Sequence, residues 1–150
     1  MPLYTPDMLL RAPTKTLAFT GAANLGAVGS VITLWTITGR VLLVYGTAFC
    51  TETVVSTANT GTIALGVAGD TAFFIAATTM GAGSLAANDW WDFVATPVGA
   101  SFEFVGSKSS VTAVALSQNV IITVATNAIT DGTLVFDCFY IPLSAGASLA

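Results

Sequence analysis

The stretch FDCFYIPLSAGASLA, residues 136–150, decides the fold class of this chain. Together with the two residues before it, it alternates like a β-strand. One face carries Leu134, Phe136, Cys138 and Tyr140, and the other carries Val135, Asp137, Phe139 and Ile141. Both faces are apolar except at Asp137, whereas a strand in a small domain usually turns one polar face to water. The sequence therefore predicts a strand that ends at Pro142 and is covered on both sides.

Strand patterns of the same kind recur along the chain, separated by Gly, Asn, Asp and Pro. They predict strands at residues 31–38, 40–49, 51–57, 62–68, 71–77, 101–105, 110–116, 119–126 and 133–141. The pair Asp131-Gly132 is the turn expected before the last strand, and residues 78–91 indicate a short helix or a long loop. No helix longer than two turns is indicated. This spacing predicts an all-β fold, an antiparallel β-sandwich or jelly-roll-like barrel.

The two ends of the chain differ from its centre. Residues 1–15 contain Pro2, Pro6 and Pro13, which favour an extended arm over helix or central strand. The arm is also apolar, so we expect it to lie on its own domain or on a neighbouring subunit. We expect the β-sandwich domain to span residues 16–142 and a tail to span 143–150. Because the start lacks the pattern of a signal peptide, we expect a protein used without export.

The composition is unusually apolar and poor in charge. Hydrophobic residues make up 54% of the chain and charged residues 8%, with a net charge of −4. A membrane-spanning helix needs about 20 consecutive apolar residues, and no window qualifies. The four basic residues are scattered, which argues against nucleic-acid binding: Arg11, Lys15, Arg40 and Lys108. The composition favours a β protein that buries part of its surface against partners.

Chemistry-bearing residues are few. Histidine is absent, which excludes a Ser-His-Asp or Cys-His site formed by this chain alone. Cys50 and Cys138 are expected to be buried free thiols rather than a disulfide. Asp89 and Asp92 should cap or solubilise a loop, and Asp137 should bond a backbone amide or a subunit partner. We therefore expect no enzyme, no cofactor and no metal site.

Trp90 and Trp91 are adjacent, so in a strand they would face opposite sides. Such a pair is typical of one core side chain and one interface side chain. A carbohydrate-binding platform is the alternative. Loss of glycan binding in Trp90→Ala or Trp91→Ala would distinguish it.

Three segments carry a resemblance to small structural proteins of tailed bacteriophages: FTGAANLGAVGSVITLWTITGRV, TIALGVAGDTAFFIAATT and DGTLVFDCFYIPLSAGASLA. Within that group the chain looks most like capsid decoration or cement proteins. The resemblance implies a β-sandwich or related barrel without catalytic residues, bound to the major capsid protein and to copies of itself, often as a trimer. It implies synthesis in the host cytoplasm and a place on the capsid surface of the virion, with no nucleic-acid or membrane partner. Another virion component, such as a head-fibre base, tail or adaptor subunit, is the alternative.

If the subunits trimerise, a neighbour would cover the second face of strand 133–141, and the tail would run along an adjacent subunit or the shell. The candidate contact residues are apolar and aromatic side chains of the arm, the Trp pair and the last strand. They are Leu3, Tyr4, Met8, Leu9, Leu10, Trp90, Trp91, Phe139, Ile141 and Leu143.

Overall fold

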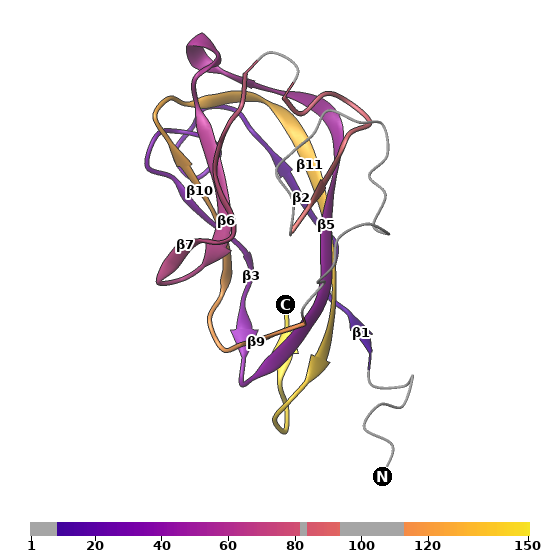
Figure 1. Cartoon of the computed structure of the whole chain (residues 1–150). Helices are drawn as coiled ribbons and strands as arrows, with labels where there is room; N and C mark the ends of the chain where they lie inside the picture. The colour runs from indigo at the N-terminus through magenta and orange to yellow at the C-terminus, as the bar shows by residue number, and fades with distance from the viewer. Residues whose placement is uncertain (1–8, 82–83, 94–112) are drawn as a thin grey trace.

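The structure is a computed structural model and describes residues 9–81, 84–93 and 113–150. Their regular secondary structure is almost entirely antiparallel β-strand, arranged mainly as two facing sheets (Figure 1). The predicted all-β sandwich is therefore confirmed. The predicted strand at 101–105 lies outside the described residues, as do residues 1–8 of the arm.

The larger sheet is built on two long strands, β5 (Val41–Ser56) and β11 (Ile129–Pro142). They pair antiparallel over nearly their whole length, from Ile129 opposite Ser56 to Pro142 opposite Val41. The free edge of β11 pairs with β1 (Leu10–Arg11) and β2 (Lys15–Ala18). The free edge of β5 pairs with β8 (Trp90–Asp92) and β9 (Val114–Leu116).

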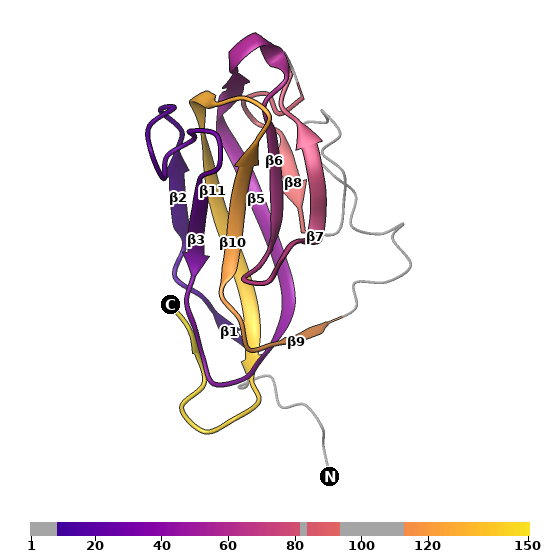
Figure 2. The same ribbon diagram turned by 90° about the vertical axis from the view of Figure 1, so that its left-hand side faces the viewer.

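The smaller sheet has four strands in the order β3, β10, β6, β7. Their bounds are Val31–Trp35, Val120–Ala125, Thr62–Val67 and Asp70–Thr79. Figure 2 looks onto this sheet, with the strands of the larger sheet behind it. A 3₁₀ turn at Thr57–Asn59 links β5 to β6. A third, two-stranded sheet joins β4 (Ile37–Thr38) to β12 (Ser148–Leu149).

One hydrophobic core fills the space between the two main sheets. Trp35 lies at its centre, with ring centroids 6.4 Å from Phe136 in an edge-on contact and 6.2 Å from Phe93. Its indole Nε1 donates a hydrogen bond of 2.8 Å to the Pro13 carbonyl, which anchors the base of the arm to the core. Cys50 and Cys138 are both buried and free, as predicted.

The two predicted strands at 40–49 and 51–57 are one strand, β5. The prediction of a break was wrong because the polar residues Thr51 and Glu52 do not end the ladder. They lie exposed at a register irregularity opposite β11, where Thr133 pairs with Glu52 and Leu134 with Cys50. A bulge of this kind absorbs an extra residue without ending a strand.

The prediction that Asp131-Gly132 is a turn was also wrong, because both residues lie inside β11. The register shifts on both sides of Asp131, so the pair forms a bulge. Gly132 has φ +109°, and a Cβ there would lie 2.5 Å from the Val54 Cα. Only glycine meets both conditions, so the sequence signal was real but marked a bulge.

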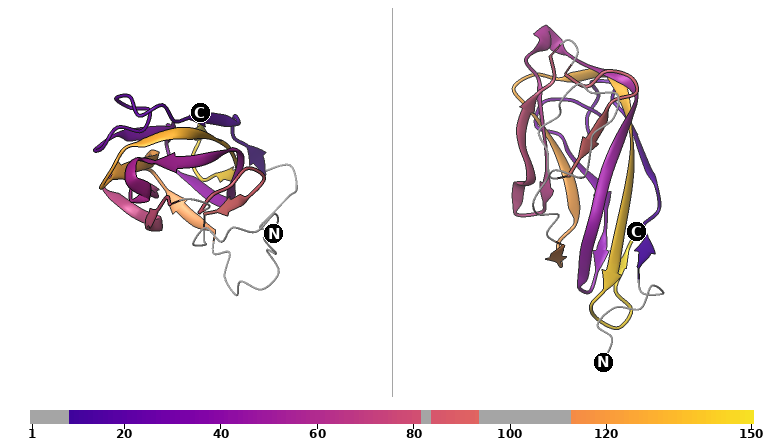
Figure 3. Two further views of the ribbon diagram at one scale, coloured as in Figure 1. Left: turned by 90° about the horizontal axis from the view of Figure 1, so that it is seen from above. Right: turned by 45° about the vertical axis from the view of Figure 1, so that its right-hand side comes forward.

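The trimer hypothesis expected the tail to run along an adjacent subunit or the shell. In the structure the tail instead folds back onto its own domain. Ser148 pairs with Thr38 and Leu149 with Ile37, and Leu149 is buried. Thr36 and Ala150 exchange two backbone hydrogen bonds of 2.8 and 3.0 Å. The right-hand view of Figure 3 shows the C-terminus returning alongside the long strands. The tail is therefore part of its own domain.

Candidate interaction surfaces

The structure separates the predicted contact residues into three groups. Leu3, Tyr4 and Met8 lie outside the described residues. Trp91 and Ile141 are only 1% and 7% exposed, so they offer little surface to a partner. Phe139 is half-buried. The remaining candidates are exposed: Leu9 (46%), Leu10 (40%), Leu143 (45%) and Trp90 (36%).

The first candidate surface is the side of the larger sheet that faces away from the core, here called the outer sheet face. It consists of Tyr45, Thr47, Phe49, Trp90, Val135, Asp137 and Phe139, which the pairing of β5, β8 and β11 places in adjacent rows. The Phe49 and Trp90 rings pack 4.8 Å apart at 52°. Trp90 is the most open of its aromatic side chains, because the others are half-buried.

An ion pair covers the middle of the outer sheet face. Arg11 donates from Nε (3.2 Å) and Nη2 to Asp137 Oδ1, and the Thr14 hydroxyl donates 2.8 Å to the same oxygen. Burial alone would raise the pKa of Asp137, but these hydrogen bonds and the Arg11 charge outweigh it and lower the pKa. These partners are side chains rather than the backbone amide that the sequence predicted. The partner is the chain's own arm, which in its described part lies on its own domain.

The second candidate surface is the end of the sandwich where β5 begins and β11 ends, here called the lower end after its place in Figure 1. β1 and β9 lie there too, because Leu10 pairs with Tyr140 and Leu116 with Val41. The exposed side chains of Leu9, Leu10 and Leu143 belong to this end. Three large apolar side chains are thus exposed around one end of a small domain.

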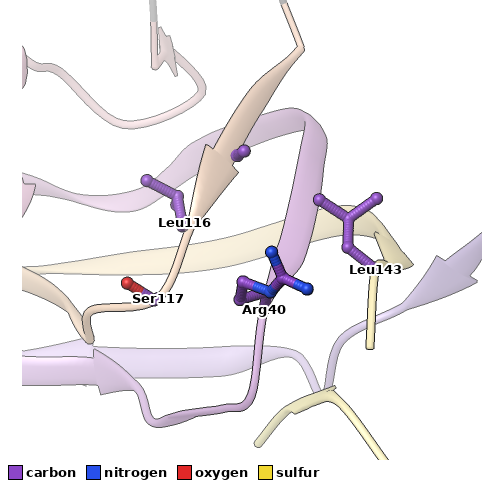
Figure 4. A pocket seen from close by; sticks show the side chains of 5 residues that line it. Arg40, Leu116, Ser117 and Leu143 are labelled. Atoms are coloured by element: carbon purple, nitrogen blue, oxygen red, sulfur yellow. The ribbon is translucent and has the colours of Figure 1, made fainter. Parts of the chain in front are cut away.

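A pocket of about 140 Å³ opens at the lower end, between the start of β5, the end of β9 and the end of β11 (Figure 4). Its lining residues are Arg40, Ala115, Leu116, Ser117 and Leu143. Gly39 (φ +69°) makes the turn that presents Arg40. The Arg40 backbone is fixed on both sides: its N–H donates 3.0 Å to Ser144 Oγ, and its carbonyl accepts 2.8 Å from the Leu143 N–H. The Arg40 guanidinium forms no salt bridge with the described residues.

The third candidate surface is the edge strand β7, which exposes Phe73. Such an edge can pair with another chain, but this one carries features that hinder pairing. Between Leu65 opposite Ile75 and Val67 opposite Asp70 the strand bulges away from β6. Asp70 Oδ1 accepts 3.2 Å from the Ala72 N–H, and Thr78 donates 2.9 Å to the Ala76 carbonyl. The edge is bent and two of its backbone groups bond its own side chains.

The two thiols, Cys50 and Cys138, and the carboxylate of Asp89 are buried within the domain. Burial raises the pKa of Cys138 to about 12, and the nearby Asp137 charge acts in the same direction. Burial also raises the pKa of Cys50. Asp89 accepts 2.8 Å from the Ala86 N–H, which confirms the loop-capping role predicted for it.

In the part of the chain that the structure describes, no three His, Cys, Asp or Glu side chains group as metal ligands. No helix in that part has the length and apolarity to cross a membrane.

Sequence reasoning missed Arg40 and the β9 residues that form the pocket. Their separation of about 75 positions leaves no local pattern, and the turn glycine before Arg40 was the only signal. No protein-family model, curated protein or solved structure matches this chain.

Proposed function

We propose that this protein is a structural subunit of a virion, a capsid decoration or cement protein. It binds the outside of the head and stabilises the shell by bridging capsomers. The observation that carries the binding role is the exposure of Leu9, Leu10 and Leu143 at the lower end. Large apolar side chains exposed at one end of a small domain are typical of protein interaction sites. The resemblance of the three sequence segments supplies the capsid as the partner.

The proposed role is mechanical, and the fold suits it. The β5–β11 pair runs the length of the larger sheet and ends at the lower end, so a load applied there is carried by a long ladder of paired residues that extends past its bulges. Binding comes from burial of apolar surface, and a standard interface buries about 1,600 Å² in total. Many copies, each bound weakly but bridging neighbouring capsomers, would together raise the energy barrier to rupture of the shell.

The first test is the copy number of this chain in purified particles, measured by quantitative mass spectrometry against the major capsid protein. A ratio near one, or a fixed large fraction of one, supports a shell-wide role. A handful of copies would move the protein to the alternative of a head-fibre base, tail or adaptor subunit. Complete absence from particles would overturn the virion proposal.

A matched pair of variants tests the lower end. Leu143→Asp places a charge in the proposed contact, and Val28→Asp places the same charge on another exposed apolar residue, in the loop after β2. That loop adjoins the opposite end of β11, because Ala18 pairs with Thr133. We expect Leu143→Asp to abolish rebinding to undecorated particles and Val28→Asp to leave it unchanged. Equal behaviour of the two variants would contradict the placement of the contact.

Carbohydrate binding is the second candidate, and Trp90 is the observation that favours it. Its ring lies on the outer sheet face against Phe49 and is partly open to solvent, as a sugar-stacking platform requires. Glycan-array binding lost in Trp90→Ala but kept in Phe73→Ala, an exposed aromatic on β7, would support this function. An array without binding would dismiss it.

A further inference from the structure

The pocket at the lower end combines one cation with an apolar wall. Of the basic residues, Arg11 is paired with Asp137, whereas Arg40 forms no salt bridge within residues 9–81, 84–93 and 113–150. Figure 4 shows the Arg40 side chain between those of Leu116 and Leu143. A complementary ligand would bring a carboxylate to the guanidinium and an apolar side chain to the two leucines.

The N-terminal arm of this chain has that chemistry. Residues 1–8 read MPLYTPDM and contain one carboxylate, Asp7, among the apolar side chains of Leu3, Tyr4 and Met8. Neither a lysine nor an arginine is present in this segment, so no basic side chain of the arm would repel Arg40. The match is chemical: one acid and several apolar groups against one base and an apolar wall.

The direction of β1 brings the arm to the correct end of the molecule. β1 runs antiparallel to β11, with Leu10 opposite Tyr140 and Arg11 opposite Phe139. The chain therefore enters β1 from the end of the sheet at which β11 finishes, at Pro142. That is the end that carries the pocket.

We propose that the pocket binds the N-terminal arm of a second copy of this chain, with Asp7 of that copy paired to Arg40. Pro2 and Pro6 favour an extended segment over a reversal into the chain's own pocket. Eight extended residues span at most about 29 Å, which is sufficient to reach a neighbour. An arm that enters the next copy's pocket is a heterologous contact, which closes into a ring when the rotation allows.

This inference deepens the proposed structural role by naming one partner, the protein itself. It is tested on the purified full-length chain by sedimentation velocity over a range of concentrations. The variants are Arg40→Glu, Asp7→Arg and the double charge reversal. Lys15→Glu is the matched control, because it makes the same charge change on β2, away from the pocket. Circular dichroism establishes that each variant is folded.

The wild type is expected to self-associate. Each single reversal places like charges together and should raise the dissociation constant about tenfold or more. The double reversal should restore association, and Lys15→Glu should leave it unchanged. A monomeric wild type, single variants that associate normally, or a double variant that stays dissociated would each overturn the proposal.

The outcome is separable from that of the proposed function. A self-associating chain that is absent from particles would keep the arm contact and remove the capsid role. A chain abundant on particles but monomeric, with binding insensitive to both charge reversals, would keep the capsid role and remove the arm contact.

Discussion

The two faces of β11 are similar in sequence but differ in what covers them. Leu134, Phe136 and Cys138 are fully buried against the smaller sheet. Val135 and Phe139 on the outer sheet face are half-buried, and no second sheet of described residues lies over them. The outer side chains are shielded by large neighbours in adjacent strands and by Arg11. An apolar face in a sequence therefore need not be a second core, because cross-strand aromatic packing can remove much of it from water.

The largest expected effect comes from replacing one phenylalanine on each face of β11. Phe136→Ala should destabilise the fold by about 3–5 kcal/mol, because it opens a cavity beside Trp35. Phe139→Ala removes a half-buried ring and should cost about 1–2 kcal/mol. The free energy of unfolding in urea measures both. Equal losses would mean that the outer sheet face is as well packed as the core.

The two adjacent tryptophans on β8 repeat the comparison one strand away. Trp91→Ala should cost about 3–5 kcal/mol, whereas Trp90→Ala should cost about 1 kcal/mol. Trp91 also has a buried indole N–H with no hydrogen-bond partner among the described residues. Trp91→Phe removes that unsatisfied donor and should therefore destabilise much less than Trp91→Ala. Thermal unfolding of the three variants checks the order, and a Trp91→Phe loss as large as that of Trp91→Ala would contradict it.

Local patterns predicted much of the fold. The alternation from 133 to 141 predicted the last strand and its end at Pro142, and the separate runs along the chain predicted most of the other strands. The same patterns failed where tertiary contacts decided the outcome. Glycine at 132 indicated a turn, but the approach of Val54, remote in sequence, makes it a bulge. Polar residues at 51 and 52 indicated a break, but a long partner strand continues through it.

The candidate surfaces were less predictable than the strands. The exposed apolar residues near both ends were identified by composition alone, including Leu10 and Leu143. Which of two adjacent tryptophans faces the core could not be read from the sequence, because period-two alternation fixes opposite faces but not their direction. The partner of Asp137 lies 126 positions away, so only the folded chain brings Arg11 to it.

A substitution at Gly46 tests how tightly the core-facing side of β5 is packed, at a position that has no side chain. Its partner across the ladder is Cys138, and a Cβ at Gly46 would lie 2.4 Å from the Phe93 ring. Gly46→Ala should destabilise by about 1–3 kcal/mol through overpacking. Gly81→Ala is the matched control, because its new Cβ would meet only ordinary contacts, and it should be close to neutral. Unfolding in urea measures both, and Phe93→Leu should recover part of the Gly46→Ala loss.

The smallest expected effect concerns the ion pair on the outer sheet face. The pKa of Asp137 is lowered in the folded protein below the ordinary carboxyl value of about 3.9, so the pair stabilises the fold above that value. The contribution is lost as the pH falls through the folded pKa. Because both partners are partly exposed, Asp137→Asn should cost only about 0.2–1 kcal/mol at neutral pH.

Unfolding in urea at pH 7 and pH 3 measures this effect. The difference between wild type and Asp137→Asn should shrink at the lower pH, which lies below the ordinary carboxyl pKa, and also in 1 M salt. A double-mutant cycle with Arg11→Gln isolates the pair, since each single change should cost about as much as both together. A difference that grows on acidification would contradict the lowered pKa. Additive single costs would mean that the arm lies on the outer sheet face without being held there by this contact.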